Sequence, residues 1–112
     1  MFINNDIKFY FFTDSLDEII TKNIKNFLIE FGEVREDGCY NKKTGNKISA
    51  CMAMHTFGFP VRLDELKKIS EQWKLPLIED TAEALGSFYK GKHVGGFGDI
   101  GVFSFNGNKI VT

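Results

Sequence analysis

Apolar residues recur along the first part of the chain at two different spacings. The run from Ile7 to Phe12 is almost wholly apolar and β-prone, which is typical of a buried strand. The apolar residues that follow lie at the spacing of one helix face: Leu16, Ile19, Ile20, Ile24, Phe27, Leu28 and Phe31. Ser15 and Glu18 have the form of a capping box, and Gly32 supplies a helix stop. The pattern predicts a strand and then a helix.

The middle of the chain repeats this alternation. The segment from Glu33 to Lys47 is polar and ends in a loop over residues 41–47, after which the apolar run 48–54 predicts a strand. A second helix is predicted over about residues 62–74 by apolar residues at helical spacing: Leu63, Leu66, Ile69 and Trp73. Residues 75–78 predict a short buried strand. Strands alternating with helices indicate βαβ units, a mostly parallel sheet and therefore an α/β fold.

Glycines concentrate near the end of the chain. Of 11 glycines, seven fall in the last 27 residues. Residues 87–94 predict a hairpin that turns at Lys90–Gly91, followed by a glycine loop over 95–99 and a strand over 100–105. The string Gly96, Gly98 and Gly101 spells G-x-G-x-x-G. A dinucleotide site needs that string to open a helix, and here a strand follows, so we reject a dinucleotide site.

Composition and charge argue against nucleic acid, membranes and metal ions as partners of this chain. The 112 residues carry a net charge of −1, which fits one domain and gives no basic excess for binding nucleic acid. No apolar run is long enough to span a bilayer and the Met1 end has no leader pattern, so we expect a cytoplasmic chain without membrane contact. Cys39 and Cys51 predict reduced thiols; His55 and His93 lack ligand-spaced partners and predict structural roles, so no metal site is expected.

The residues with chemical potential lie at the ends of two predicted strands. Glu79 and Asp80 follow the predicted strand 75–78, where ligands bind in open α/β sheets, although Asp80 could instead cap a short helix over 81–85. Ser104 ends the last strand, and Lys109 follows it beside apolar residues, where its amine could act as a nucleophile or simply be solvated. A lysine, a carboxylate and a hydroxyl are what pyridoxal phosphate requires of a protein.

Several segments together resemble the nucleotide-sugar aminotransferases of the DegT/DnrJ/EryC1/StrS family. They are Ile78–Ser87, Tyr89–Gly95, Gly98–Lys109 and, upstream, Met54–Leu66. The resemblance is strong over residues 48–112 and looser before them. It implies the large domain of a fold type I pyridoxal 5'-phosphate transferase.

Each candidate residue matches a position of the family's motifs. Lys109 matches the Schiff-base lysine, Asp80 the partner of the pyridine nitrogen, Glu83 the Gln or Glu near the cofactor ring, and Ser104 a phosphate ligand. The resemblance implies a homodimer that moves an amino group from an amino-acid donor, usually glutamate, to a nucleotide-linked keto sugar in polysaccharide or glycan biosynthesis. Relatives that act as dehydratases carry histidine in place of the lysine, so Lys109 argues against that branch.

Members of the family are several times longer than this chain. We therefore expect residues 1–112 to be a fragment of the cofactor-binding large domain, without a second domain, lacking the N-terminal part and the C-terminal small domain, and inactive alone. Two alternatives stay open: an inactive truncated remnant or interaction fragment of such an enzyme, and a small nucleotide-binding module that uses the glycine loop.

Overall fold

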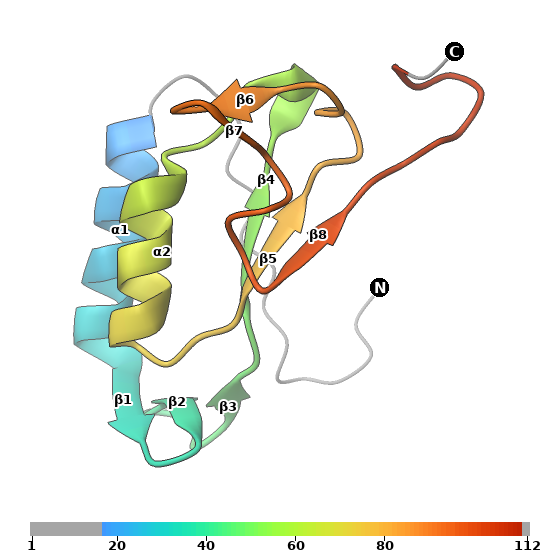
Figure 1. The fold of residues 1–112 in the computed structure, drawn as a ribbon. Coiled ribbons are helices and arrows are strands. Elements are labelled where there is room, and N and C mark those ends of the chain that lie inside the picture. Colours follow the sequence, from blue (N-terminus) through green and yellow to red (C-terminus); the bar gives the residue numbers. More distant parts are fainter. Residues whose placement is uncertain (1–16, 111–112) are drawn as a thin grey trace.

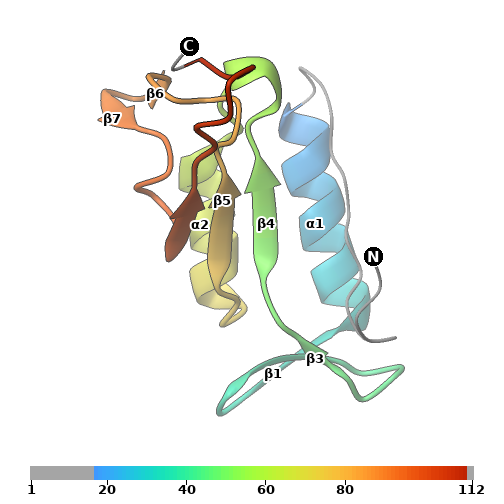
Figure 2. The same ribbon diagram turned by 90° about the vertical axis from the view of Figure 1, so that its right-hand side faces the viewer.

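Two helices cover one face of a small parallel sheet (Figure 1). The computed structural model describes residues 17–110, so the predicted strand over 7–12 and the cap at Ser15 lie outside the described residues. Helix α1 spans Asp17–Phe31 and helix α2 spans Leu63–Gln72, as predicted. Figure 2, turned to face the sheet, shows both helices behind it.

The sheet contains β4 (Cys51–Met54), β5 (Leu77–Asp80) and β8 (Ile100–Val102), in the order β4-β5-β8. Both pairings are parallel, so β4, α2 and β5 form one βαβ unit and the predicted α/β class is confirmed. The last residues of the three strands, Met54, Asp80 and Val102, stand side by side in register. The strands therefore end level with one another, at one edge of the sheet.

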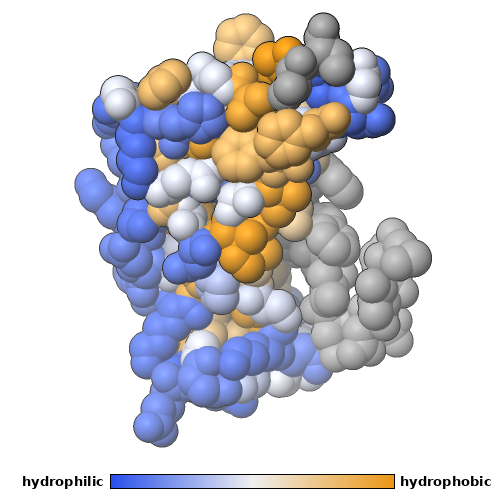
Figure 3. All heavy atoms as spheres, turned by 45° about the vertical axis from the view of Figure 1, so that its right-hand side comes forward, coloured by the Kyte–Doolittle hydropathy of each residue, from blue (hydrophilic) through white to orange (hydrophobic). Residues whose placement is uncertain are grey.

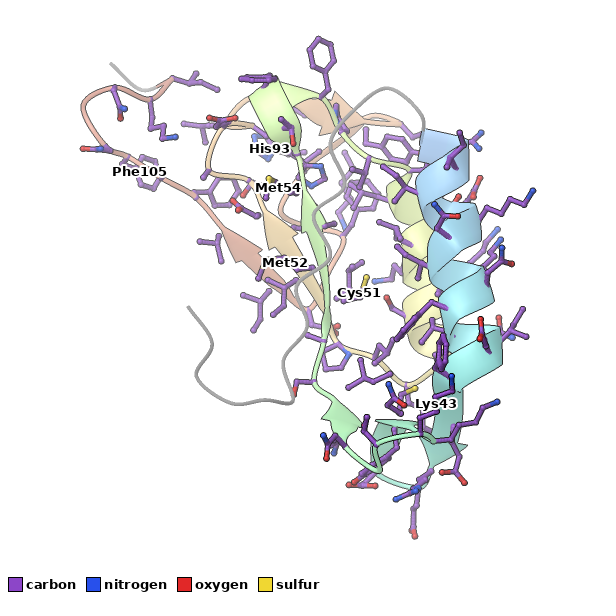
Figure 4. The ribbon with its side chains drawn as sticks, turned by 180° about the vertical axis from the view of Figure 1, so that it is seen from behind. Lys43, Cys51, Met52, Met54, His93 and Phe105 are labelled. Atoms are coloured by element: carbon purple, nitrogen blue, oxygen red, sulfur yellow. The ribbon has the colours of Figure 1, made fainter. Side chains whose placement is uncertain are left out.

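The core lies between this sheet and the helices. Alternation along each strand decides which side chains enter it. Cys51 points toward the helices, and Met52 and Met54 lie on the other face (Figure 4). The buried apolar residues come from the helices, the strands and the segments that connect them: Leu28, Cys39, Ala53, Leu63, Leu66, Ile69, Leu75, Leu77, Ala84 and Val94. Each large aliphatic side chain buried in this way stabilises the fold by about 1.5–3 kcal/mol.

A second, antiparallel sheet lies at the end of the molecule opposite the carboxyl ends of β4, β5 and β8 (Figure 1). It contains β1 (Gly32–Arg35), β2 (Gly38–Asn41) and β3 (Lys47–Ile48). The polar character of this segment concealed these strands, because most of their residues are exposed or only partly buried, and only Gly38 and Cys39 of β2 are buried. The predicted loop is present between β2 and β3.

The predicted hairpin forms, with β6 (Phe88–Tyr89) and β7 (Lys92–His93) joined at Lys90–Gly91. Both turn residues have positive φ, 47° and 80°, which suits the right-handed twist of a two-residue hairpin. The hairpin docks on α2, where Asp64 accepts hydrogen bonds from Tyr89 (2.5 Å) and Lys90 (2.6 Å). The bonds from Lys90 and Tyr89 hold the pKa of Asp64 well below its usual range.

Three predicted boundaries are wrong. The run 48–54 is divided between two sheets, because Ile48 pairs with Cys39 and β4 begins at Cys51. The strand predicted over 75–78 is β5, which begins two residues later at Leu77. The strand predicted over 100–105 ends at Val102.

The face of the sheet opposite the helices carries exposed apolar side chains. Met52 is 43% exposed, Ile100 55% and Val102 49%. Figure 3 shows apolar residues gathered in a band over this side and its upper loops, with hydrophilic residues over the helices and the lower end. Within residues 17–110, no helix is both long and apolar enough to cross a membrane.

Candidate functional site

The segments that follow the three parallel strands converge at one edge of the sheet. After β4 the chain enters a 3-10 turn, Thr56–Gly58; after β5 it makes turns through Glu83; and after β8 it runs to Lys109. In open α/β sheets this edge, beyond the carboxyl ends of the strands, is where ligands bind. The candidate residues lie in these segments.

Glu83 joins all three segments. Its Oε2 accepts a hydrogen bond of 3.0 Å from the backbone N–H of Phe57, which follows β4. Its Oε1 lies 3.6 Å from the Nζ of Lys109, which follows β8. The side chains are 43% and 25% exposed for Glu83 and Lys109, so the ion pair is partly shielded from water. The structure thus brings the predicted residues Lys109 and Glu83 together.

Asp80 ends β5 on the same edge. Its Oδ1 accepts a hydrogen bond of 3.1 Å from the backbone N–H of Ala82, and no other hydrogen bond reaches its carboxylate from residues 17–110. The side chain is half-buried, and Oδ2 accepts no hydrogen bond from residues 17–110. The alternative that Asp80 caps a helix over 81–85 is wrong, because that stretch forms turns.

Ser104 stands apart from the other three candidates. It lies two residues after β8 and is half-buried, but within the described chain its hydroxyl makes no hydrogen bond to Asp80, Glu83 or Lys109. The neighbouring strand ends are fixed instead by Thr81, whose backbone N–H and hydroxyl both donate to the carbonyl of Val102. Thr81 is fully buried and was not among the predicted residues.

Glu79 was named from the sequence together with Asp80 but was given no role, and the structure places it inside the core. It is fully buried on the helix side of β5 and accepts four hydrogen bonds. The donors are the backbone N–H groups of Gly95 (2.7 Å), Phe97 and Gly98 (both 2.6 Å), and the ring of His55 (3.1 Å). Burial raises the pKa of Glu79, but the hydrogen bonds from Gly98, Gly95, His55 and Phe97 outweigh it and hold that pKa below its usual value.

The glycine loop is therefore folded around an internal carboxylate. Its N–H groups donate to Glu79, which argues against the nucleotide-binding module that would use them for phosphate. As predicted, the G-x-G-x-x-G string leads into a strand, β8. Its glycines allow close packing, since a Cβ on Gly98 would lie 2.5 Å from the carbonyl of Leu77 and one on Gly101 would lie 2.2 Å from that of Gly95.

Both histidines occupy structural positions, as predicted. The Nδ1 of His55 accepts the backbone N–H of Val61 at 3.3 Å, which leaves the proton on Nε2 to donate to Glu79. His93 accepts the N–H of Gly86 at 2.8 Å. A period of two along β5 was the signal that could have located Glu79, because it places this residue on the same face as the buried Leu77.

The donor set at the sheet edge fits pyridoxal phosphate in its chemistry. Asp80 offers a carboxylate oxygen for a protonated ring nitrogen, and Lys109 offers an amine for the aldehyde. The hydroxyl of Thr56 is buried and has no hydrogen-bond partner among residues 17–110, although buried hydroxyls usually have one. Together with Ser104 it gives the edge two hydroxyls for polar groups of a ligand.

The DegT/DnrJ/EryC1/StrS aminotransferase family model matches residues 25–112. The chain is 45% identical over 71 residues to EpsN of Bacillus subtilis (strain 168), whose name assigns it provisionally to the pyridoxal phosphate-dependent aminotransferases; the match covers 63% of this chain and 18% of EpsN. It is 48% identical over 71 residues to GDP-perosamine synthase of Escherichia coli O157:H7, covering 63% of this chain and 20% of that protein.

Among solved structures, PseC of Helicobacter pylori, an aminotransferase involved in the biosynthesis of pseudoaminic acid, superposes with a TM-score of 0.55 at 33% identity. The superposition covers 61% of this chain and 19% of PseC. The chain thus spans about a fifth of the length of these relatives. The fold and the sequence matches point to the same family.

Proposed function

Because the chain belongs to the DegT/DnrJ/EryC1/StrS aminotransferase family, we propose that it forms part of the cofactor-binding large domain of a pyridoxal phosphate-dependent aminotransferase. The proposed reaction moves an amino group from an amino-acid donor, glutamate in the first instance, to a nucleotide-linked keto sugar. The names of the relatives support this class of substrate, since one is a GDP-perosamine synthase and another acts in pseudoaminic acid biosynthesis. We also propose that the active protein is a homodimer in the cytoplasm.

Four residues carry the roles in this proposal. The Nζ of Lys109 binds the cofactor and, when the amine donor displaces it, takes and returns the proton on the reacting carbon. The carboxylate of Asp80 keeps the ring nitrogen protonated. Glu83 orients the amine of Lys109, and the hydroxyl of Ser104 donates to the phosphate. When bound, pyridoxal phosphate supplies the electron sink that makes that proton acidic.

One observation carries the proposal. Lys109 and Glu83 meet at 3.6 Å although they follow different strands, and Asp80 ends the strand that leads to Glu83. A lysine with only a solvating role does not require a carboxylate from another segment beside its amine. A lysine that alternates between a covalent bond and proton transfer requires its amine to be held at one place.

The test uses the protein expressed from the whole gene that encodes this chain. Glutamate and a panel of nucleotide-linked keto sugars, beginning with the GDP-linked class, are supplied together with pyridoxal phosphate, and the release of 2-oxoglutarate is measured. We expect turnover in the unsubstituted protein, no turnover in Lys109→Ala, and unchanged turnover in Lys68→Ala, an exposed lysine of α2. Borohydride reduction followed by peptide mass spectrometry should place the cofactor on Lys109.

Two outcomes would overturn the proposal. Turnover retained in Lys109→Ala would remove the role of that amine. Absence of both turnover and trapped cofactor would favour the alternative of an inactive remnant or interaction fragment.

A further inference from the structure

We propose that Glu79 is a positioning residue for the candidate site: through His55 it fixes the Thr56–Gly58 turn, whose backbone orients Glu83 against Lys109. The inference rests on the proposed function, because the importance of Glu83 and Lys109 depends on it. Glu79 itself touches neither residue in the described structure. Its influence passes through the imidazole of His55.

The first step is that the ionised carboxylate of Glu79 accepts hydrogen bonds from four donors. Both Glu79 and His55 have fully buried side chains. Three of the four donors are backbone N–H groups of the glycine loop, so Glu79 fixes that loop and His55 at the same time. An amide in place of the carboxylate would present two hydrogens to a site made only of donors.

The second step is that His55 closes a small loop. Its Nε2 donates to Glu79, and its Nδ1 accepts the N–H of Val61, so one ring sets the positions of both ends of the segment 55–61. Because Nδ1 must accept, the tautomer is fixed, and the bond to Glu79 is the contact that favours it. Loss of Glu79 would release both the tautomer and the angle of the ring.

The third step is that this closed segment holds a strained residue at the site. Phe57 has φ of 53°, a left-handed conformation that is uncommon for a bulky side chain. Phe57 is 80% exposed, so packing of its side chain does not stabilise the conformation. The strained backbone points the N–H of Phe57 at Oε2 of Glu83, the carboxylate whose other oxygen faces Lys109.

A matched control exists on the same strand pair. Asp99 also places a carboxylate on backbone, accepting the N–H of Leu77 at 2.8 Å, but it does so at the opposite end of β5 and β8. Asp99→Asn therefore changes a carboxylate to an amide at an exposed position without reaching the Thr56–Gly58 turn. Glu79→Gln makes the same chemical change at the proposed position.

The experiment compares amide hydrogen exchange in the protein expressed from the whole gene, without any cofactor, in the unsubstituted form and in the Glu79→Gln and Asp99→Asn variants. In Glu79→Gln we expect the amides of Phe57 and Val61 to exchange at least about tenfold faster relative to Leu66 in α2, and Lys109 to react faster with acetic anhydride. Asp99→Asn should leave these ratios unchanged. A residue with only a general structural role would not move the reactivity of Lys109 selectively.

Unchanged protection at Phe57 and Val61 in Glu79→Gln would overturn the proposal, and so would an equal acceleration at every amide in both variants. Should Glu79→Gln fail to fold, His55→Ala is the second test, because it leaves the three backbone donors on Glu79 but removes the ring that donates to Glu79 and accepts from Val61. Selective loss of protection at Phe57 and Val61 supports the proposal, and retained protection contradicts it. The exchange and labelling measurements use no cofactor, so their outcome can be interpreted even if the aminotransferase assay shows no activity.

Discussion

The amine of Lys109 lies 3.6 Å from the carboxylate of Glu83, and this pair links the segment after β8 to the segment after β5. The same carboxylate accepts the N–H of Phe57 from the segment after β4. Three loops that are distant in sequence thus share one side chain. Changes at Glu83 should separate its two functions, acceptance of the backbone hydrogen bond and neutralisation of the lysine.

Substitution of Glu83 by Gln should preserve the first function and lose the second. A Gln oxygen can still accept the N–H of Phe57, so its amide exchange should stay within about threefold of the unsubstituted chain, while Glu83→Ala should accelerate it at least about tenfold. Lys109 should react faster with acetic anhydride in both variants. Equal exchange rates for Phe57 in Gln and Ala variants would contradict the bridging role.

Acid should destabilise the fold through Glu79. Because the pKa of Glu79 is lower in the folded than in the unfolded chain, its contribution is complete above the usual carboxylate pKa of about 4.3 and is lost as pH falls through the lower folded value. Urea unfolding from neutral pH to pH 3 should show this loss. Glu79→Gln should be less stable at neutral pH by about 3 kcal/mol and show a shallower decline in that acid window.

The control for the acid prediction is Glu71→Gln, at an exposed position of α2, which should keep the full decline. His55, the titratable group that faces Glu79, is present in all three proteins. An equal acid slope in Glu79→Gln and the unsubstituted chain would show that Glu79 is not the source.

Packing of the glycine loop against β8 gives a third prediction. A Cβ at Gly101 would lie 2.2 Å from the carbonyl oxygen of Gly95, so Gly101→Ala should push the loop from the strand and destabilise the fold by about 3 kcal/mol. A Cβ at Gly107 meets nothing within 4 Å, so Gly107→Ala should change stability by less than about 0.5 kcal/mol. Urea midpoints measure both, and similar midpoints for the two variants would contradict the packing argument.

The cysteines should be slow to alkylate in the folded chain. Burial raises the pKa of Cys51 to about 11, and burial also raises the pKa of Cys39. Near pH 8 only about one Cys51 thiol in a thousand is then ionised. Iodoacetamide labelling followed by mass spectrometry should be far slower for both cysteines than in denaturing urea. Rapid labelling of either without urea would show that its site opens.

The elements that sequence predicted well depend on local patterns. Helices α1 and α2 follow from apolar residues at helical spacing, and the hairpin follows from Lys90–Gly91, because each needs only neighbours in sequence to be recognised. The strands β1 and β2 lack an apolar face, so no such pattern marks them.

Non-local partners explain what the sequence did not reveal. A charged residue at position 79 ended the predicted strand, yet the strand continues because the glycine loop, far along the chain, supplies the donors that allow Glu79 to be buried. The candidates Lys109 and Asp80 came from their chemistry and from the family resemblance, and Glu83 came from the resemblance alone. The bridge from Phe57 through Glu83 to Lys109 depends on three loops and could only be seen in the fold.

The carboxylate inside the glycine loop also constrains how this sequence can change over time. The buried carboxylate of Glu79 is stable in the core only while three backbone N–H groups donate hydrogen bonds to it. Those N–H groups in turn have an acceptor only while a carboxylate occupies position 79. A substitution on either side alone leaves buried donors or a buried charge unsatisfied. The effect of a mutation in the loop must therefore depend on the residue at position 79, which makes the two a site of strong epistasis.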